Sequence, residues 1–409
     1  MYKNLILDNQ DLIKNIKTIK RDYEFYNDIL SLHKIVSFVW ARRTWKTFLM
    51  IDFVKQLIKE KKIELEQVVF IDFSLYSNQK LDPREIILDY KELFLDKEPF
   101  FIFDEIQDIS NFKEFVLYLY NFWYKIFISW SNSKLLSSEL TTHFRGRVFQ
   151  YNVLPLTFLE ALRFKQISYK NNFSSIEQAK VNTVLNDILE FWSFPEIVLS
   201  ENRLFKIDNL KTYLDILIYK DLLERYKIDN EVSLKYLIKS LTLWFTKQVN
   251  INKIYNELKS KNIKVWKTTL YEYYEYIKNI FYIFELENYY NPKWSKESFL
   301  YNIWFNKILL NKVNLWQSFE NLIFLELKKK YEKVFFKKNW LEIDFYIEEN
   351  DLNVQACYEL DNSNLKREIN PLKKSYNNIL VYYKKEEWLQ IPDNIKLLSF
   401  LEFIEEQKK

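Results

Sequence analysis

Apolar residues follow two periodicities in the first part of the chain. Five short apolar runs have the length of buried strands: residues 34–39, 67–73, 100–103, 125–129 and 147–153. Segments with apolar residues at helical spacing lie between them, such as KTFLMIDFVKQLIKE directly after Trp45. Strands that alternate with helices predict an α/β fold with a parallel sheet and helices on both faces.

The pattern changes twice further along the chain. Residues 157–240 are mostly helical in pattern, and residues 240–290 carry three short helical patterns and then the strand-like run FYIFELENYY. Because the third of these helices falls at about 267–280, the order predicts a winged helix-turn-helix. From about residue 300, a helix (FENLIFLELKKKY), the strands VFFKK, LEIDFYI and LNVQACYEL, a second helix and the strand NILVYYK predict a mixed α/β domain. We therefore expect three domains, at 1–165, 166–295 and 296–409.

Composition narrows the class of protein. Of the 409 residues, 48% are hydrophobic and 28% are charged, which is typical of a globular protein. A net charge of +4 excludes a surface that is basic throughout but allows a local basic face. The single cysteine, Cys357, excludes an intrachain disulfide, and two histidines leave little room for a histidine-rich metal site. No apolar run approaches the roughly 18 residues of a spanning helix, and no signal-peptide pattern is seen, so we expect a cytoplasmic protein without membrane contact.

Glycine is almost absent, and tryptophan is abundant. The chain has 1 glycine, Gly146, and 12 tryptophans, although average usage of about 7% would place about 29 glycines in a chain of this length. Several tryptophans occupy positions where a turn is expected. Trp340 follows Asn339 between two strand-like runs, where an Asn-Gly hairpin turn is typical, and Trp130 lies between two serines at the end of an apolar run.

Reading glycine at Trp40 and Trp45 changes WARRTWKT into GARRTGKT, which is the G-x-x-x-x-G-K-[ST] phosphate-binding loop. Some genetic codes assign the UGA codon to glycine and others assign it to tryptophan. We therefore hypothesise that these tryptophans are misread glycine codons. The alternative is a glycine-poor protein with genuine tryptophans, in which the loop is blocked.

The loop lies between a predicted strand and a predicted helix, as a phosphate loop requires. In such a loop, backbone N–H groups bind phosphates, Lys46 reaches the β- and γ-phosphates of ATP, and the Thr47 hydroxyl binds Mg²⁺. The expected nucleotide-binding residues are Trp40, Ala41, Arg42, Arg43, Thr44, Trp45, Lys46 and Thr47.

Two further segments complete the expected site. The apolar run FFIF ends at Asp104 and Glu105, which is the Walker B arrangement. We expect Asp104 to hold Mg²⁺ and Glu105 to orient or deprotonate the attacking water. At the end of the next strand, Ser131 and Asn132 are candidate sensors of the γ-phosphate.

Two arginines, Arg145 and Arg147, flank Gly146. We expect one of them, with Arg147 preferred, to act as an arginine finger, in its own chain or in a neighbouring subunit.

These motifs, with FFIFDEIQD, ISWSNSKLLSSEL, FRGRVFQYNVLPLTFLEAL, FWSFPEIV and TTLYEYYEYI, resemble the ATPases that have an N-terminal AAA domain of the AAA_14 type and a C-terminal DUF4143 domain. The resemblance covers nearly the whole chain. It implies a P-loop NTPase that binds ATP and Mg²⁺ and hydrolyses ATP. It also implies a C-terminal domain with the PD-(D/E)xK nuclease fold.

In that nuclease fold, Mg²⁺ is held by a helix glutamate, a hairpin aspartate, and an acidic residue two positions before a lysine. The first two correspond to Glu320 or Glu326 and to Asp344. The third element is Gln355-Ala356-Cys357, which lacks both the carboxylate and the lysine, so we expect no nuclease activity.

Lysines cluster near the expected helix-turn-helix, at 253, 259, 261, 264 and 267, and near residues 328–338. They are compatible with contacts to a nucleic-acid backbone, but a solvated lysine surface is the better explanation. The main hypothesis is an AAA-type ATPase that acts on a DNA or protein partner. The alternatives are a degenerate binding protein with an inactive nucleotide site and a DNA-binding protein. The oligomeric state is not predicted.

Overall fold

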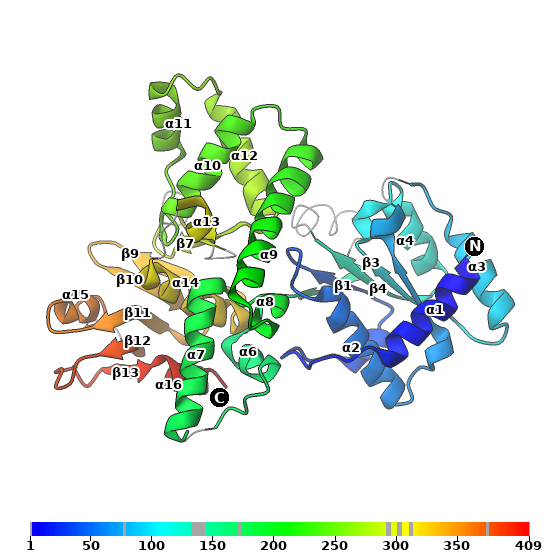
Figure 1. The fold of residues 1–409 in the computed structure, drawn as a ribbon, viewed down its shortest axis with the longest axis horizontal. Helices are drawn as coiled ribbons and strands as arrows, with labels where there is room; N and C mark the ends of the chain where they lie inside the picture. Colours follow the sequence, from blue (N-terminus) through cyan, green and yellow to red (C-terminus); the bar gives the residue numbers. More distant parts are fainter. Residues whose placement is uncertain are drawn as a thin grey trace. The chain divides into compact units, whose positions relative to one another are not determined.

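In the computed structural model, the chain divides into two compact units (Figure 1). The first unit comprises Met1–Gln166 with Phe194–Glu196, and the second comprises Ile167–Ser193 with Ile197–Lys409. The structure describes residues 2–76, 79–131, 144, 146–170, 173–291, 296–300, 305–310, 314–373 and 376–408.

The first unit is built on a parallel sheet of five strands in the order β2-β3-β4-β1-β5, and it has the P-loop NTPase fold that the sequence predicts. Its strands are β1 (Ile35–Val39), β2 (Val68–Asp72), β3 (Phe100–Asp104), β4 (Lys125–Trp130) and β5 (Val148–Asn152). All five predicted strands are confirmed. Every residue of β1 and β3 is buried, which is typical of a parallel sheet covered on both faces.

Helices α2 (Lys46–Lys59), α3 (Pro83–Leu93) and α4 (Phe112–Asn121) lie between these strands in the chain, and α6 (Phe158–Phe164) follows β5. Short 3₁₀ turns lie at Asn27–Leu30, Leu65–Gln67, Phe73–Tyr76 and Ile106–Asp108. An N-terminal helix, α1 (Tyr2–Asn15), was not predicted; it buries Tyr2, Ile6 and Ile13. Because β4 lies between β1 and β3, the carboxyl ends of these three strands are adjacent at one edge of the sheet.

The second unit begins with long helices. They are α7 (Ser175–Phe191), α9 (Arg203–Ile216), which continues into a π-helical segment (Leu217–Glu224), α10 (Glu231–Leu243), α11 (Ile251–Ser260) and α12 (Lys267–Asn279). The short helix α8 (Pro195–Leu199) precedes α9. After α10, the chain forms the short strand β6 (Lys247–Gln248), then α11 and α12, and then β7 (Ile283–Asn288) and β8 (Lys296–Leu300). β8 pairs antiparallel with both β6 and β7. This is the order of elements that the sequence predicts, and the winged helix-turn-helix itself stays a prediction.

The C-terminal part contains the helices and strands that the sequence predicts from residue 300 onward, together with four elements that the sequence does not predict. They are α13 (Phe305–Leu310), α14 (Leu315–Lys330), β9 (Phe335–Lys338), β10 (Glu342–Ile347), a 3₁₀ turn (Glu348–Asn350), β11 (Leu352–Leu360), α15 (Leu365–Ile369), β12 (Asn378–Lys385), β13 (Ile395–Ser399) and α16 (Phe400–Lys408). Of these, α13, the 3₁₀ turn, β13 and α16 were not predicted.

The expected boundary at 295/296 falls within a single sheet of eight strands, in the order β13-β12-β11-β10-β9-β7-β8-β6. β7 pairs with β8 across that boundary, and β7 also runs parallel to β9, with Glu287 opposite Phe335. The segments that we expected as two domains therefore form one unit, because strand pairing joins them.

Tryptophans occupy backbone conformations that favour glycine. Among the described residues, 14 non-glycine residues have positive φ, and Trp45, Trp123, Trp192 and Trp388 are among them. Four of the ten tryptophans among the described residues is far above the few per cent expected of non-glycine residues. Trp192 is also fully buried, and its indole N–H has no hydrogen-bond partner within the described part of the chain. Trp340, at the β9–β10 turn, does not have positive φ, so the glycine geometry expected there is wrong.

Candidate functional site

The loop between β1 and α2 lies at the carboxyl edge of the first sheet. It begins where the Trp40 N–H donates to the Trp130 carbonyl over 3.2 Å, next to the end of β4. Arg43 and Trp45 both adopt the left-handed conformation, with φ of 69° and 59°. Trp45 is the N-cap of α2, so the loop runs directly into the amino end of a helix. Such an end attracts anions through its free N–H groups and its dipole.

Lys46, the first residue of α2, extends its side chain back over the loop. Its ammonium donates to the carbonyl oxygens of Trp40 and Ala41 over 3.1 and 3.0 Å, and it lies 4.0 Å from a carboxylate oxygen of Glu105. The residue is only 5% exposed. The loop thus holds a buried positive charge beside the helix amino end, as a phosphate site requires.

Thr47 and Asp104 lie side by side. The Thr47 hydroxyl donates to one carboxylate oxygen of Asp104, and the Ser129 hydroxyl donates to the other. Burial raises the pKa of Asp104 to about 6, and the neighbouring negative charge of Glu105 adds to this shift. A hydroxyl and a buried carboxylate from two different segments therefore converge on one point.

Glu105 is held by its own set of contacts. Ser131 and the side chain of Gln107 each donate to its carboxylate over 2.5 Å, and its backbone N–H donates to the Ser129 hydroxyl over 2.8 Å. Burial acts to raise the pKa of Glu105, but the positive charges of Lys46 and Arg42 outweigh it and hold that pKa below its ordinary value. Glu105 is thus ionised at neutral pH and can accept a hydrogen bond from water.

The predicted residues Lys46, Thr47, Asp104, Glu105 and Ser131 therefore meet at the carboxyl ends of β1, β3 and β4. Residues 40–45 form the surrounding loop. Arg43 forms an ion pair with Glu196 at 3.5 Å, at the outer side of that loop. Asn132 and Arg145 lie outside the described residues.

Arg147 is not brought to this site. It directly precedes β5, and the Ile35 N–H donates to its carbonyl oxygen, so it lies at the amino end of β1. The loop leaves β1 at the other end, after five residues that span about 16 Å in a parallel strand. The guanidinium of Arg147 instead lies 5.1 Å from the centre of the Tyr120 ring. An arginine finger within the same chain is thus not formed by Arg147, because the parallel register places it at the opposite edge.

Sequence reasoning missed Ser129 and Gln107. Ser129 contacts both Asp104 and Glu105, and Gln107 contacts Glu105. Ser129 precedes the candidate Ser131 by two residues, so both side chains point to the same side of an extended strand. This alternation of side chains along the strand could have identified Ser129 from the sequence.

A polar cavity of about 730 Å³ lies in the C-terminal part of the chain. Glu320 and Asp344 line it, as the nuclease resemblance implies, whereas Glu326 is not part of its lining. Gln355 also lines it and donates to Glu368 of α15 over 3.0 Å. The carboxylate that the strand lacks at position 355 is thus supplied from a neighbouring helix.

The protonation state of this cavity differs from that of the first site. Burial raises the pKa of Asp344 to about 8, although the Ala356 N–H, which donates over 2.8 Å, opposes this shift. Cys357 is fully buried in an apolar cluster with Ile343 and Leu360, at the position where a nuclease has its lysine. Across the described residues, no three histidine, cysteine, aspartate or glutamate side chains come together in a way that could hold a metal ion.

None of the helices in the described ranges is long and apolar enough to cross a membrane.

Two family models match the chain. A model described as AAA domain (AAA_14) matches residues 33–162, and a domain of unknown function, DUF8612, matches residues 183–299. The first match confirms the AAA-type P-loop domain. The expectation of a DUF4143 domain is wrong, because the region beyond the AAA domain matches DUF8612.

Similar proteins are found over nearly the full length. An uncharacterized protein of Methanocaldococcus jannaschii, MJ1544, is 34% identical over 98% of this chain and 94% of its own length. An uncharacterized protein of Haemophilus influenzae is 25% identical over 91% of this chain and 94% of its own length. Among solved structures, Cdc6p from Pyrobaculum aerophilum is 12% identical over 73% of this chain and 89% of its own, with a TM-score of only 0.26. The extent and identity of the first match show that the chain belongs to the same protein family as MJ1544, with an AAA domain in its N-terminal unit.

Proposed function

We propose that the protein is a Mg²⁺-dependent ATPase of the AAA type. The observation that carries this proposal is the convergence of Lys46, Thr47, Asp104 and Glu105 at the edge where β1 and β3 end. A buried lysine at a helix amino end, a hydroxyl–carboxylate pair and an ionised glutamate are the groups that phosphoryl transfer from ATP requires. The match to the AAA-domain model over residues 33–162 also supports an AAA-type ATPase.

Each residue has a separate task in this proposal. Lys46 gives up its contacts with the carbonyl oxygens of Trp40 and Ala41 and binds the β- and γ-phosphates instead. Glu105 accepts a hydrogen bond from the attacking water and aligns it with the γ-phosphorus. Ser131, which holds Glu105 over 2.5 Å, keeps that carboxylate in place. Most of the rate enhancement then comes from position and charge rather than from covalent chemistry.

The side chains at the site fit Mg²⁺. Thr47 and Asp104 provide a hydroxyl oxygen and a carboxylate oxygen that are in direct contact, and Mg²⁺ in ATP sites is bound by few protein oxygens together with phosphates. Two adjacent carboxylates, the buried Asp104 and the partly buried Glu105, would also be stabilised by a nearby cation. When bound, Mg²⁺ would neutralise charge on the β- and γ-phosphates.

The proposal requires glycine at positions 40 and 45, and we propose that the functional protein carries it there. The left-handed conformation at position 45 favours glycine, and the Trp45 indole stacks on Phe48 at a ring distance of 4.2 Å, beside the start of α2. A loop without these side chains lets the backbone approach phosphate.

The test compares ATP binding in three proteins by isothermal titration with Mg-ATP. The parent carries Trp40→Gly and Trp45→Gly, and the other two add either Lys46→Ala or, as a matched control, Lys59→Ala at the exposed end of α2. We expect the parent and the control to bind and the Lys46 variant to lose binding. A parent that does not bind Mg-ATP would overturn the proposal in favour of a binding protein with an inactive nucleotide site.

A second candidate function is binding of duplex DNA by α11 and α12. These helices follow each other as in a helix-turn-helix, and a groove of about 660 Å³ lies at the turn between them. Lys259, Lys264 and the exposed Trp266 line that groove, and Lys267 begins α12. Recognition helices contact DNA with their amino-terminal residues. The exposed Glu272 and Glu275 lie further along α12, so phosphate contacts are confined to its first turn.

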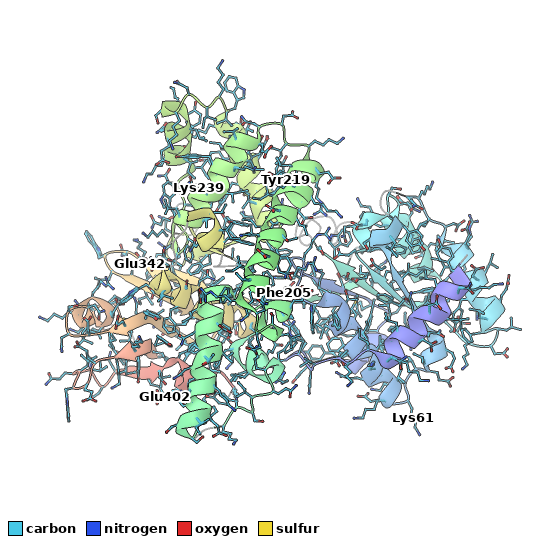
Figure 2. The ribbon with its side chains drawn as sticks, viewed as in Figure 1. Lys61, Phe205, Tyr219, Lys239, Glu342 and Glu402 are labelled. Atoms are coloured by element: carbon cyan, nitrogen blue, oxygen red, sulfur yellow. The ribbon has the colours of Figure 1, made fainter. Side chains whose placement is uncertain are left out.

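Fluorescence anisotropy with a 20-base-pair duplex tests this candidate. We expect Lys264→Ala with Lys267→Ala to weaken binding and to reduce the slope of log affinity against log salt by about 2. The control removes two exposed lysines that do not line the groove, Lys211 on α9 and Lys239 on α10 (Figure 2). Equal losses in the two double variants would argue against a defined DNA surface.

A further inference from the structure

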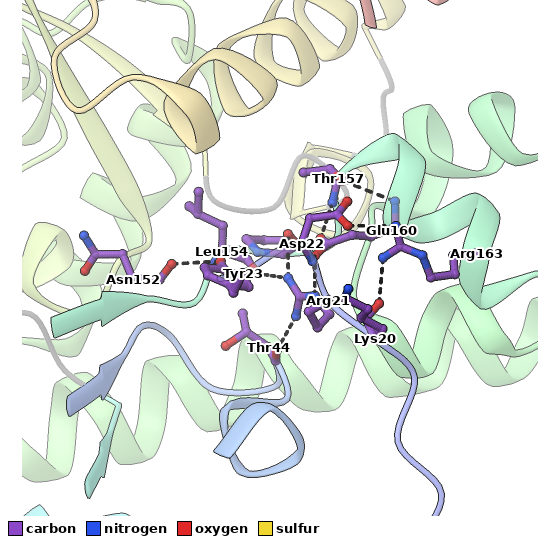
Figure 3. Close-up of polar contacts among 11 residues, drawn as sticks. Lys20, Arg21, Asp22, Tyr23, Thr44, Asn152, Leu154, Thr157, Glu160 and Arg163 are labelled. Carbon is purple, nitrogen blue, oxygen red and sulfur yellow. Dashed lines mark hydrogen bonds and ion pairs between the residues drawn. The ribbon is translucent and has the colours of Figure 1, made fainter. Parts of the chain in front are cut away.

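A buried arginine outside the recognised motifs is connected to the phosphate loop. Arg21 lies in the segment between α1 and β1 and is 4% exposed (Figure 3). Its guanidinium donates to a carboxylate oxygen of Glu160 over 2.8 Å, to the Thr44 carbonyl over 3.0 Å and to the Leu154 carbonyl over 2.8 Å. A fourth contact, to the Pro155 carbonyl, is 3.3 Å long. One side chain thus joins the loop, helix α6 and the segment after β5.

Both carboxylate oxygens of Glu160 accept hydrogen bonds. One of its oxygens accepts from Arg21 and from the Asp22 N–H over 2.6 Å, and the other accepts from the Thr157 N–H over 2.9 Å. The Thr157 hydroxyl accepts from the Glu160 N–H in return, so the same glutamate forms a capping box at the start of α6. The Arg21–Glu160 pair is therefore rigid, because both side chains have their positions set by several backbone groups.

The contact with Thr44 has a consequence for the next residue. A peptide unit is planar and trans, so the carbonyl of residue 44 and the N–H of residue 45 point in opposite directions. The hydrogen bond from Arg21 fixes the direction of the Thr44 carbonyl, and with it the opposite direction of the residue-45 N–H. The hydroxyl of Thr44 stabilises the same turn by donating to the Ala41 carbonyl over 3.1 Å.

We propose that Arg21 is a positioning residue for ATP: it fixes the Thr44–Trp45 peptide so that the residue-45 N–H faces the phosphates, and Glu160 anchors Arg21 to α6. This inference rests on the proposed ATP-binding function and names residues outside the phosphate-loop and Walker B motifs. Since an amide that is already oriented loses little entropy on binding, the arrangement favours tight nucleotide binding rather than a faster chemical step.

The test uses a paired substitution, because removing one partner leaves a buried, uncompensated charge. Arg21→Met with Glu160→Gln removes both charges at similar volume, and the glutamine can still cap α6. The control is Arg163→Met, which removes an arginine of α6 that donates to Asp22 and to the Lys20 carbonyl but makes no contact with Thr44. All variants are made in the full-length protein with glycine at positions 40 and 45.

Three measurements are made on each variant: the Kd for Mg-ATP, the KM and kcat of hydrolysis, and the melting temperature. We expect the paired variant to bind Mg-ATP about tenfold or more weakly, with KM raised, kcat nearly unchanged and the folded state retained at the assay temperature. The control should match the parent in Kd and KM.

A paired variant that is folded and binds Mg-ATP as tightly as the parent would overturn the inference. If the paired variant and Arg163→Met lose the same affinity for Mg-ATP, the inference is also overturned. The loss would then come from a general disturbance of α6 and not from the contact between Arg21 and Thr44. If the paired variant does not fold, Arg21→Lys provides the comparison, since it keeps the charge and loses the fork that spans Glu160 and Thr44. Failure of the parent itself to bind Mg-ATP would instead count against the proposed function.

Discussion

Ser131 donates a hydrogen bond to Glu105 over 2.5 Å, although the two residues lie 26 positions apart in the chain. Glu105 directly follows β3 and Ser131 directly follows β4, and these strands are neighbours in a parallel sheet. The contact places a polar group beside the carboxylate that we propose as the water-orienting residue. A shift of either strand end would therefore change how that carboxylate points.

Replacing Glu105 with glutamine should separate binding from turnover. In the protein with glycine at positions 40 and 45, Glu105→Gln should bind Mg-ATP normally but lower kcat by about 10²–10⁴-fold, because the water loses its charged acceptor while Lys46 and Asp104 remain. Titration and a phosphate-release assay measure the two quantities. Glu114→Gln, on the exposed side of α4, is the control. Unchanged turnover in Glu105→Gln would exclude the role proposed for Glu105.

Removing the Thr47 hydroxyl should weaken ATP binding only when Mg²⁺ is present. We expect Thr47→Val to weaken ATP binding by about tenfold in Mg²⁺ and to leave the weaker binding in EDTA unchanged, because valine keeps the shape but removes the oxygen. Thr47→Ser should restore the Mg²⁺-dependent affinity. An equal loss with and without Mg²⁺ would show that the residue supports the loop rather than the metal.

Two exposed tryptophans allow a direct test of the glycine hypothesis. Trp388 is 92% exposed with positive φ, and Trp340 is 94% exposed without it, so neither contributes much burial. We expect Trp388→Gly to raise the free energy of unfolding by about 1 kcal/mol, because it relieves a left-handed conformation. Trp340→Gly should lower it by about 0.5–1 kcal/mol, because glycine has more freedom in the unfolded chain. Urea unfolding measures the change in the free energy of unfolding for each substitution. If the two changes have the same sign, backbone strain at the left-handed position does not explain them.

The whole set of tryptophans can be tested together. The version with glycine at all 12 tryptophan positions should be soluble and bind Mg-ATP, whereas the printed sequence should be insoluble or fail to bind it, since the strain at separate positions roughly adds. One thermal melt and one titration for each protein decide this. Equal melting temperatures and equal affinities would mean that the tryptophans are tolerated, and UGG codons at these positions in the gene would lead to the same conclusion.

The C-terminal cavity should not cleave DNA. Although Glu368 places a carboxylate near Gln355, Cys357 is buried in the apolar cluster and offers no positive charge for a nucleophile. Supercoiled plasmid incubated with the protein and Mg²⁺ or Mn²⁺ should therefore remain intact. Nicking that disappears in Asp344→Ala would reverse this prediction and assign a metal to the cavity.

Local patterns in the sequence were sufficient to predict the strands of the first sheet and the central residues of its site. An apolar run bounded by polar residues identifies a buried strand, and Lys46-Thr47 and Asp104-Glu105 each follow such a run within a few residues. Since the carboxyl ends of parallel strands meet at one edge, these two pairs could be predicted to converge before the strand order was known.

What the tertiary structure alone decided depends on pairing between distant segments. The parallel register of β1 with β5 placed Arg147 at the wrong edge for an arginine finger within the same chain, and the pairing of β7 with β9 merged two expected domains. Arg21 and Glu160 are 139 residues apart, so no local pattern links them. The sequence determined the strands of the first sheet and which residues carry charge, because those depend on neighbouring side chains. Their partners were decided by strand order and burial, because these are properties of the whole packed chain.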